Sequence, residues 1–229
     1  VIRRRVLDRL TDFVTRTRIA QREVVNHAGI TLTFSHVNSQ TRSRNRTFAT
    51  KEPDTLTWIE GFLPGQVLWD IGANVGLYSV YAAKKGVQVV AIEPSVFNLE
   101  FLVRNICMNE LEERILVLPM AVGTKIPCFE TLSLASASWG DSGNSYATRN
   151  DSRGQVGRFD ISYKVPGVPL DSLTSLFGTP APDHVKIDVD GIEADIVESG
   201  ARTFSKVTSV LVEVPEIAGS GERIANALA

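Results

Sequence analysis

The stretch that decides the fold is WDIGANVGLYSVYAA, residues 69–83. An apolar strand ends in an acid, a glycine-containing turn follows, and a helical segment comes next. Glycines here let the backbone turn tightly and let a ligand approach the helix N-terminus. The pattern is D-x-G-x-N-x-G; Asn74 and Leu77 stand where the dinucleotide fingerprint G-x-G-x-x-G needs glycines. The acid suits a cationic ligand, and the candidate binding residues are Asp70, Gly72, Asn74 and Gly76.

The same strand–helix rhythm continues along the chain. Strands are expected at 67–72, 87–94, 115–122, 185–191 and 207–214, and helices at 74–86, 95–110 and 192–201. This spacing predicts an α/β fold with a doubly wound, mostly parallel sheet. Residues 123–168 interrupt the rhythm with two strand-like segments around a loop rich in Ser, Asn, Asp and Gly, which predicts an antiparallel insertion.

The first 51 residues are expected to form an N-terminal extension of helix and strand, ahead of a main domain at 52–229. We predict an amphipathic helix over 1–28, strands at 30–37 and around 44–49, and a helix that begins at Pro53. Asp171 is expected at the cap of a short helix. Because the chain begins with Val1, its native start is expected to have been trimmed.

Charge is distributed unevenly along this chain of 229 residues. The net charge is −2, yet residues 1–46 hold ten arginines against three acids, so that segment carries about +7. A basic arm can dock on nucleic acid or an anionic membrane, or it can be the solvated face of a helix; we expect the second and no nucleic-acid partner. Cys107 and Cys128 have no metal or C-x-x-C spacing. The sequence shows no apolar run long enough to cross a membrane and no secretory segment, which predicts a cytoplasmic protein; a homodimer stays open.

A second acid, Glu93, follows the next strand, 21 residues after Gly72. Doubly wound folds place at this distance the acid that holds a ribose diol. An acid, a glycine turn and a second acid at this spacing favour S-adenosylmethionine over a nicotinamide cofactor.

With these motifs, the chain resembles the FkbM-type methyltransferases. The resemblance is carried by WDIGANVGLYSVYAA, AIEPSVFNLEFLVRN, PMAVG, LDSL and VKIDVDGIEADIVESGA, and covers roughly residues 52–215. It implies a class I methyltransferase fold, S-adenosylmethionine as donor, and O-methylation of a hydroxyl on a sugar or natural product. The family usually has Glu where Asp190 stands. Its fold has seven strands, and the final antiparallel pair is not expected here, because the fifth strand is followed only by part of a helix. In PMAVG, Ala121 and Val122 are further candidates for cofactor binding.

The segment VKIDVDGIE, residues 185–193, concentrates charge at one strand end. Asp188 is the first candidate for the base, or for orienting the acceptor, and Lys186 would lower its pKa. Asp190 and Glu193 have the spacing of a capping box, and Glu193 is kept as a catalytic candidate. Three acids in nine residues could also bind Mg²⁺, but no feature requires a metal. His184 lies at the opposite end of the strand and is expected to be structural.

Contacts to the acceptor are expected from segments outside the main motifs. His36 is a candidate base or substrate contact, and Glu52, Trp139, Ser142 and Asn144 are candidate substrate contacts. The partner is expected to be a small molecule or glycan with a free hydroxyl. Two alternatives stay open: a nicotinamide-dependent oxidoreductase on a similar sheet, and a non-catalytic module with a basic docking arm.

Overall fold

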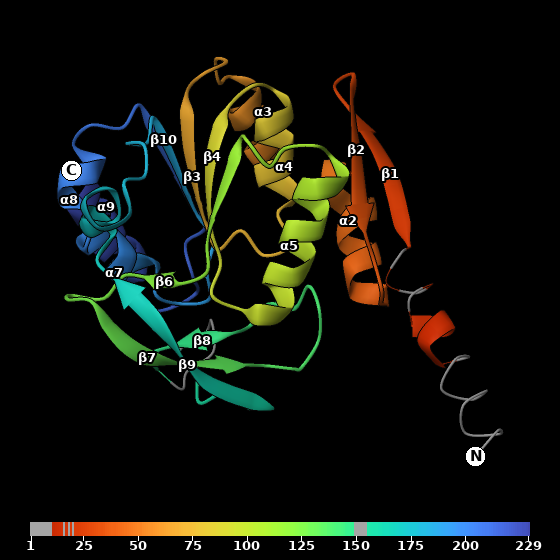
Figure 1. The fold of residues 1–229 in the computed structure, drawn as a ribbon. Coiled ribbons are helices and arrows are strands. Elements are labelled where there is room, and N and C mark those ends of the chain that lie inside the picture. The colour runs from red at the N-terminus through yellow and green to blue at the C-terminus, as the bar shows by residue number, and fades with distance from the viewer. Residues whose placement is uncertain (1–10, 16, 18, 20, 149–154) are drawn as a thin grey trace.

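A parallel five-stranded sheet forms the centre of the molecule (Figure 1). The computed structural model describes residues 11–15, 17, 19, 21–148 and 155–229. The strand order is β11-β10-β3-β4-β5, and every neighbouring pair is parallel. The strands are β3 (Val67–Ile71), β4 (Gln88–Ile92), β5 (Ile115–Leu118), β10 (His184–Ile187) and β11 (Ser209–Val212). The predicted doubly wound, mostly parallel sheet is confirmed.

Each face of this sheet has its own hydrophobic core, because alternate side chains along a strand point to opposite faces. On one face, Leu68 and Val89 pack with α4 (Leu77–Lys84) and α5 (Val96–Met108). On the other, Trp69 and Val90 pack with α7 (Glu193–Glu198) and α9 (Ser220–Leu228). Strands buried on both faces are typical of parallel sheets.

The extension differs from its sequence prediction in two places. Residues 22–27, expected at the end of a helix, form β1 (Arg22–His27), which pairs antiparallel with β2 (Ile30–Ser35). The expected strand around 44–49 lies within α2 (Ser39–Lys51). The reason is a capping box: Asn38 accepts from the Thr41 backbone N–H, and the Thr41 hydroxyl accepts from the Asn38 N–H. Of the expected first helix, residues 1–10 lie outside the described part of the chain.

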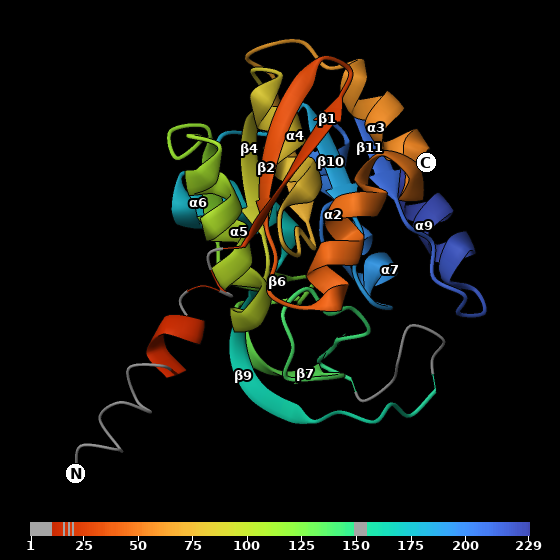
Figure 2. The ribbon, with the colours of Figure 1, turned by 90° about the vertical axis from the view of Figure 1, so that its right-hand side faces the viewer.

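The insertion forms a second sheet of four strands, ordered β6-β9-β7-β8. Its strands are β6 (Ala121–Val122), β7 (Cys128–Leu134), β8 (Ser145–Tyr146) and β9 (Ile161–Val168). The predicted strand 115–122 is therefore divided between two sheets, since Pro119 between them has no backbone N–H to continue the ladder. This sheet lies across the carboxyl ends of the central strands, with α2 nearby (Figure 2).

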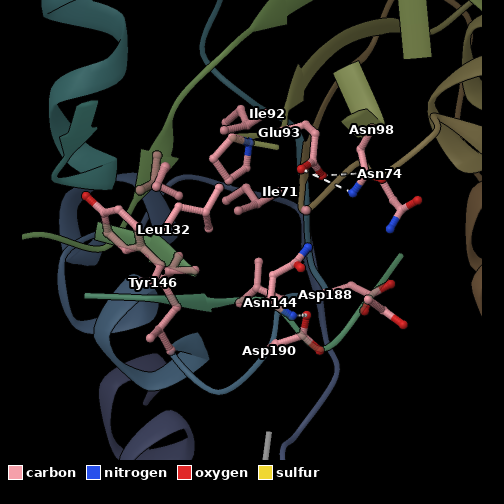
Figure 3. Close-up of a pocket in the computed structure, with 18 of the residues that line it drawn as sticks. Ile71, Asn74, Ile92, Glu93, Asn98, Leu132, Asn144, Tyr146, Asp188 and Asp190 are labelled. Carbon is pink, nitrogen blue, oxygen red and sulfur yellow. Dashed lines mark hydrogen bonds between the residues drawn. The ribbon is translucent and has the colours of Figure 1, made fainter. Parts of the chain in front are cut away.

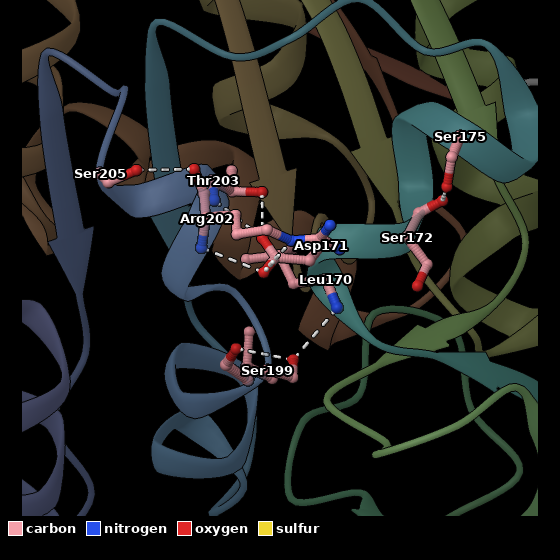
Figure 4. Close-up of polar contacts among 9 residues, drawn as sticks. Leu170, Asp171, Ser172, Ser175, Ser199, Arg202, Thr203 and Ser205 are labelled. Carbon is pink, nitrogen blue, oxygen red and sulfur yellow. Dashed lines mark hydrogen bonds and ion pairs between the residues drawn. The ribbon is translucent and has the colours of Figure 1, made fainter.

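The remaining elements connect the layers. They are α3 (Pro53–Glu60), a 3₁₀ turn η1 (Leu170–Ser172), α6 (Leu173–Phe177) and α8 (Ala201–Phe204). The predicted helix over 192–201 is interrupted between α7 and α8 at Ser199 and Gly200. Asp171 does not cap η1; its carboxylate accepts from the backbone N–H groups of Arg202 and Thr203 and so fixes the start of α8 (Figure 4). Among the described helices, none is both long and apolar enough to cross a membrane.

Candidate functional site

A cavity opens where the strands of the central sheet end (Figure 3). Strand order reverses between β3 and β10, and ligands of doubly wound sheets bind at such a point. Residues at the ends of four central strands line the cavity, namely Gly72, Glu93, Asp188 and Glu213. The rest of the wall comes from the insertion and from α2. Two sheets and the N-terminal extension thus meet at one cavity.

The glycine turn after β3 forms the floor of the site. The N–H groups of Gly72 and Ala73 both donate to the Ile92 carbonyl, at 3.0 and 3.1 Å. Gly72 has φ +81°, and a Cβ there would collide with the Asp188 carbonyl. Gly76 is the left-handed N-cap of α4, and a Cβ there would meet Leu102. Both glycines are required by conformation and by space.

Glu93 connects this turn to the next one. Its carboxylate accepts from the backbone N–H groups of Asn74 and Ser95, each at 2.8 Å, and from the Asn98 amide at 3.4 Å. The side chain is only 4% exposed. Burial raises the pKa of Glu93 to about 7, although these hydrogen bonds act in the opposite direction.

Asp70 lies in a smaller neighbouring cavity that shares Gly72, Asn74 and Asp188 with the main one. Its Oδ2 accepts from the Ser79 hydroxyl at 2.5 Å, while the buried Oδ1 has no partner. Burial raises the pKa of Asp70, and the Lys186 ammonium opposes that rise. The unpaired oxygen marks a place for a hydrogen-bond donor of a ligand.

Lys186 and Asp188 form a buried ion pair. The Nζ atom of Lys186 lies 2.5 Å from Asp188 Oδ2, and the lysine side chain is 2% exposed. Burial alone would lower the pKa of Lys186, but the carboxylates of Asp188 and Asp70 raise it. Burial alone would raise the pKa of Asp188, but Lys186 and a hydrogen bond from Glu213 hold it well below its usual range. Asp188 is therefore an anion at neutral pH.

Asp190 does not cap the next helix, which corrects the capping-box prediction. The N-cap of α7 is Ile192, with no side-chain hydrogen bond. Instead, Asp190 Oδ2 accepts from the backbone N–H groups of Gly143 and Asn144, at 2.8 and 3.0 Å. Asp190 thereby holds the insertion loop over the cavity.

Glu193, the other half of the expected capping box, is buried and does not reach the cavity. It is 1% exposed, is absent from the cavity wall, and accepts from the Gly191 N–H at 3.2 Å. Its Oε2 has no partner, and burial raises its pKa to about 7. This catalytic candidate therefore lies outside the wall of the main cavity.

The insertion loop is tied to the glycine turn as well. The side-chain amides of Asn74 and Asn98 donate to the Asp141 carbonyl, at 2.9 and 3.3 Å. Two of the predicted substrate contacts, Ser142 and Asn144, line the cavity. Asn144 Oδ1 is buried there without a partner. The insertion loop therefore adds polar groups to the wall of the cavity.

Three other candidates lie elsewhere. Trp139 donates from its ring N–H to Glu100 at 2.8 Å and packs against Phe101, outside the cavity wall. His36 is buried outside the wall, and burial lowers its pKa. Glu52 lines two neighbouring cavities, beside Lys186, and not the main one.

The remaining predicted positions fit their expected places. Ala121 and Val122 line the main cavity. His184, expected to be structural, stacks on Phe62 with ring centroids 3.7 Å apart and hydrogen-bonds Ser209 and Gln66 at the opposite end of β10. Within the part of the chain that the structure describes, no group of three or more His, Cys, Asp or Glu side chains is placed to hold a metal ion.

The sequence analysis did not predict several residues that line the main cavity. Glu213 could have been found, since it ends β11 in the way that Asp188 ends β10. Arg44 and Lys51 could not, because both lie on α2, a helix that was not expected there. Asp141 and Tyr146 belong to the insertion, whose path carries no periodic signal.

Comparison with known proteins gives one family and one curated relative. A model described as methyltransferase FkbM domain matches residues 70–226. Hexuronic acid methyltransferase AglP of Haloferax volcanii is 26% identical over 148 residues, which are 65% of this chain and 55% of that protein. The chain thus spans just over half the length of this relative.

Two solved structures with low sequence identity are similar to this chain. Precorrin-6y C5,15-methyltransferase from Geobacter metallireducens is 15% identical, with a TM-score of 0.44, and the match covers 77% of this chain and 67% of that one. Trm5b from Pyrococcus abyssi is 12% identical, with a TM-score of 0.46, covering 90% of this chain and 46% of that one.

Proposed function

The chain belongs to the methyltransferase FkbM family, and from this premise we propose that it transfers a methyl group from S-adenosylmethionine to an oxygen of a sugar or another hydroxylated metabolite. The match establishes the family; the methyl transfer, its oxygen acceptor and the chemical class of that acceptor are the proposal. The family match favours this activity over the nicotinamide-dependent and non-catalytic alternatives.

The residues present fit the donor, which supplies a methyl group on a positively charged sulfur. Three acids line the two cavities beside the glycine turn, namely Asp70, Glu93 and Asp188. We assign Glu93 to the ribose hydroxyls and the unpaired Oδ1 of Asp70 to the ammonium of the amino-acid part. Gly72 lets the turn pack directly against the Asp188 backbone, where no Cβ fits, so the turn and the end of β10 lie together at the cavity.

One observation supports an oxygen acceptor above all: polar groups of the insertion line the same cavity as the acids. Ser142 and Asn144 belong to its wall, and Asn144 keeps an unpaired buried oxygen. Short polar side chains bond hydroxyl groups, as sugar recognition requires. Asp188 would help to orient the acceptor, whose oxygen must lie about 3 to 3.5 Å from the methyl carbon for the transfer. The curated relative acts on a hexuronic acid by its printed name, which is consistent with a sugar.

The test has two parts. Isothermal titration with S-adenosylmethionine should show binding in the wild type and its loss in Asp70→Ala. Mass spectrometry of a panel of neutral sugars and hexuronates, incubated with the enzyme and labelled donor, should show one added methyl group. No transfer to any oxygen acceptor would contradict the proposed class of acceptor.

Treatment of the product with mild alkali then distinguishes methylation of a hydroxyl from methylation of a carboxylate. An ether formed on a hydroxyl survives the treatment, whereas a methyl ester formed on a hexuronate carboxylate is cleaved. We expect the ether, since a carboxylate acceptor carries no proton and would leave a base at the strand ends without a role.

A further inference from the structure

Two carboxyl groups stand side by side at the ends of neighbouring strands. Asp188 follows β10 and Glu213 follows β11, and the Glu213 backbone N–H donates to the Ile187 carbonyl at 2.9 Å, which fixes the register. Both residues line the main cavity and the cavity next to Glu52. Their carboxyl groups act on each other's pKa in opposite directions, which lowers that of Asp188 and raises that of Glu213. Two acids that interact in this way titrate as a pair.

The two members have unequal surroundings. Asp188 is paired with the buried Lys186, while no ion pair reaches Glu213 among the described residues. The charged groups around Glu213 come from three elements: Asp188 and Lys186 on β10, Glu52 before α3, and Lys51 at the end of α2. The hydrogen bond to Asp188, partial burial and the charges of Asp188 and Glu52 raise the pKa of Glu213 to about 8, against the effect of Lys186. The pair therefore holds one proton at pH 7, on Glu213.

We propose that Glu213 is the proton acceptor of the methyl transfer and that Asp188, held by Lys186, is the fixed anion that positions it. This rests on the proposed transfer to a hydroxyl. The acceptor oxygen forms its bond to the methyl carbon, the electron pair of the broken carbon–sulfur bond stays with the donor, and the hydroxyl proton passes to the Glu213 carboxylate. Glu213 is exposed at the cavity mouth, so the proton can leave to solvent.

Glu213 suits this role better than Asp188 for a physical reason. A general base works best when its pKa lies near the working pH, because a weaker base gains little from accepting the proton. Asp188, paired with an ammonium group, is too weak a base. His36, the other candidate base, lies outside the cavity wall.

The first test measures the titration of Asp188 and Glu213 in the absence of an acceptor. In carbon-detected NMR, one carboxyl group of the wild type should titrate near pH 8, and this transition should be absent from Glu213→Gln. In Asp188→Asn it should move toward the ordinary glutamate range of about 4 to 5, since an amide donor stabilises the Glu213 anion. Glu93 and Glu193 should titrate near pH 7 in the wild type and in Glu213→Gln alike. If the transition near pH 8 is absent from the wild type, or is still present in Glu213→Gln, the proposal is overturned.

The second test measures turnover with the acceptor found in the sugar panel. Wild-type kcat should rise with pH through about 8, as Glu213 loses its proton. Glu213→Gln keeps a hydrogen bond to Asp188 but cannot accept a proton, so kcat should fall by about 10²- to 10⁴-fold and the rise with pH should vanish. Binding of S-adenosylmethionine should stay within about threefold, which separates this role from failure of the donor site.

Glu216→Gln is the matched control, because Glu216 is an exposed glutamate three residues further on and lines none of the cavities described here. It should keep wild-type kcat and the same pH profile. If Glu213→Gln also keeps both, the proton goes elsewhere and the proposal is wrong.

Discussion

At the scale of single residues, Glu93 shows what its position in the sequence could and could not foretell. Its spacing from Gly72 predicts a place beside the glycine turn, and the structure brings the two together. Its bonds to the backbone of Asn74 and Ser95 could not be foreseen, because they depend on how two loops approach each other. Burial of this carboxylate also follows from that approach, and with it the raised pKa.

Glu93→Gln should weaken S-adenosylmethionine binding by roughly 10- to 100-fold, since charge-assisted hydrogen bonds of about 1.5 to 3 kcal/mol are lost. Wild-type affinity should increase as the pH rises through about 7, because the ribose hydroxyls donate to the ionised form. Isothermal titration at several pH values checks both effects. Glu222→Gln, at an exposed position in α9, should change neither.

Gly72→Ala should both destabilise the protein and abolish donor binding. The new Cβ would meet the Asp188 backbone, which cannot move without shifting β10, and φ is +81°. Gly65→Ala isolates the conformational part, since Gly65 has φ +88° with nothing nearby. Urea unfolding should show a cost of about 1 kcal/mol for Gly65→Ala and a larger one for Gly72→Ala. Equal costs would show that Asp188 does not crowd the turn.

At the scale of elements, the sequence correctly predicted the segments with a clear hydrophobic periodicity. The prediction failed where the start of a helix depends on capping interactions. The buried strands and the helix after Pro53 follow from apolar runs and from the position of proline. The stretch around 44–49 is too polar for a helical stripe, and α2 depends on the Asn38–Thr41 box and on contacts with the insertion. Asp190 was misassigned because a capping-box spacing cannot reveal a competing loop.

Asp190→Ala should release the insertion loop. The backbone N–H groups of Gly143 and Asn144 lose their acceptor, so their hydrogen exchange should speed up and KM for the sugar acceptor should rise several-fold. Donor binding should change little, because Gly72 and Glu93 are not involved. Asp160→Ala, an exposed acid in the same insertion, serves as the control. Unchanged exchange at both amides would rule out this anchoring role.

At the scale of the whole molecule, buried carboxyls make stability depend on pH. The pKa values of Glu93 and Glu193 are raised to about 7 and that of Glu213 to about 8. For such acids the folded state binds more protons than the unfolded one between pH 4.5 and the folded pKa. Their stabilising contribution is complete below the unfolded pKa and is lost as the pH rises through 7 to 8.

The donor-free protein should therefore unfold at a lower temperature at pH 8.5 than at pH 6.5. Differential scanning fluorimetry measures the difference, and Glu193→Gln should reduce it without touching the cavity wall. A melting temperature that rises over this range would show that the three carboxyls are not protonated in the fold.

The overall plan was predictable, since alternating strands and helices with one antiparallel interruption leave few arrangements. The way the insertion closes the cavity was not, because loop paths depend on contacts such as Asn74 with Asp141 that leave no periodic trace.

The pairing of β6 with β9 has a consequence for how this molecule could be re-engineered. Val122 and Val168 are direct neighbours across that pair, so the chain leaves the central fold and returns to it at nearly the same point. The segment between them can be exchanged as a cassette through two adjacent junctions, with the glycine turn and Glu93 left in place. Recombining such cassettes would change what the enzyme methylates while its donor half stays constant.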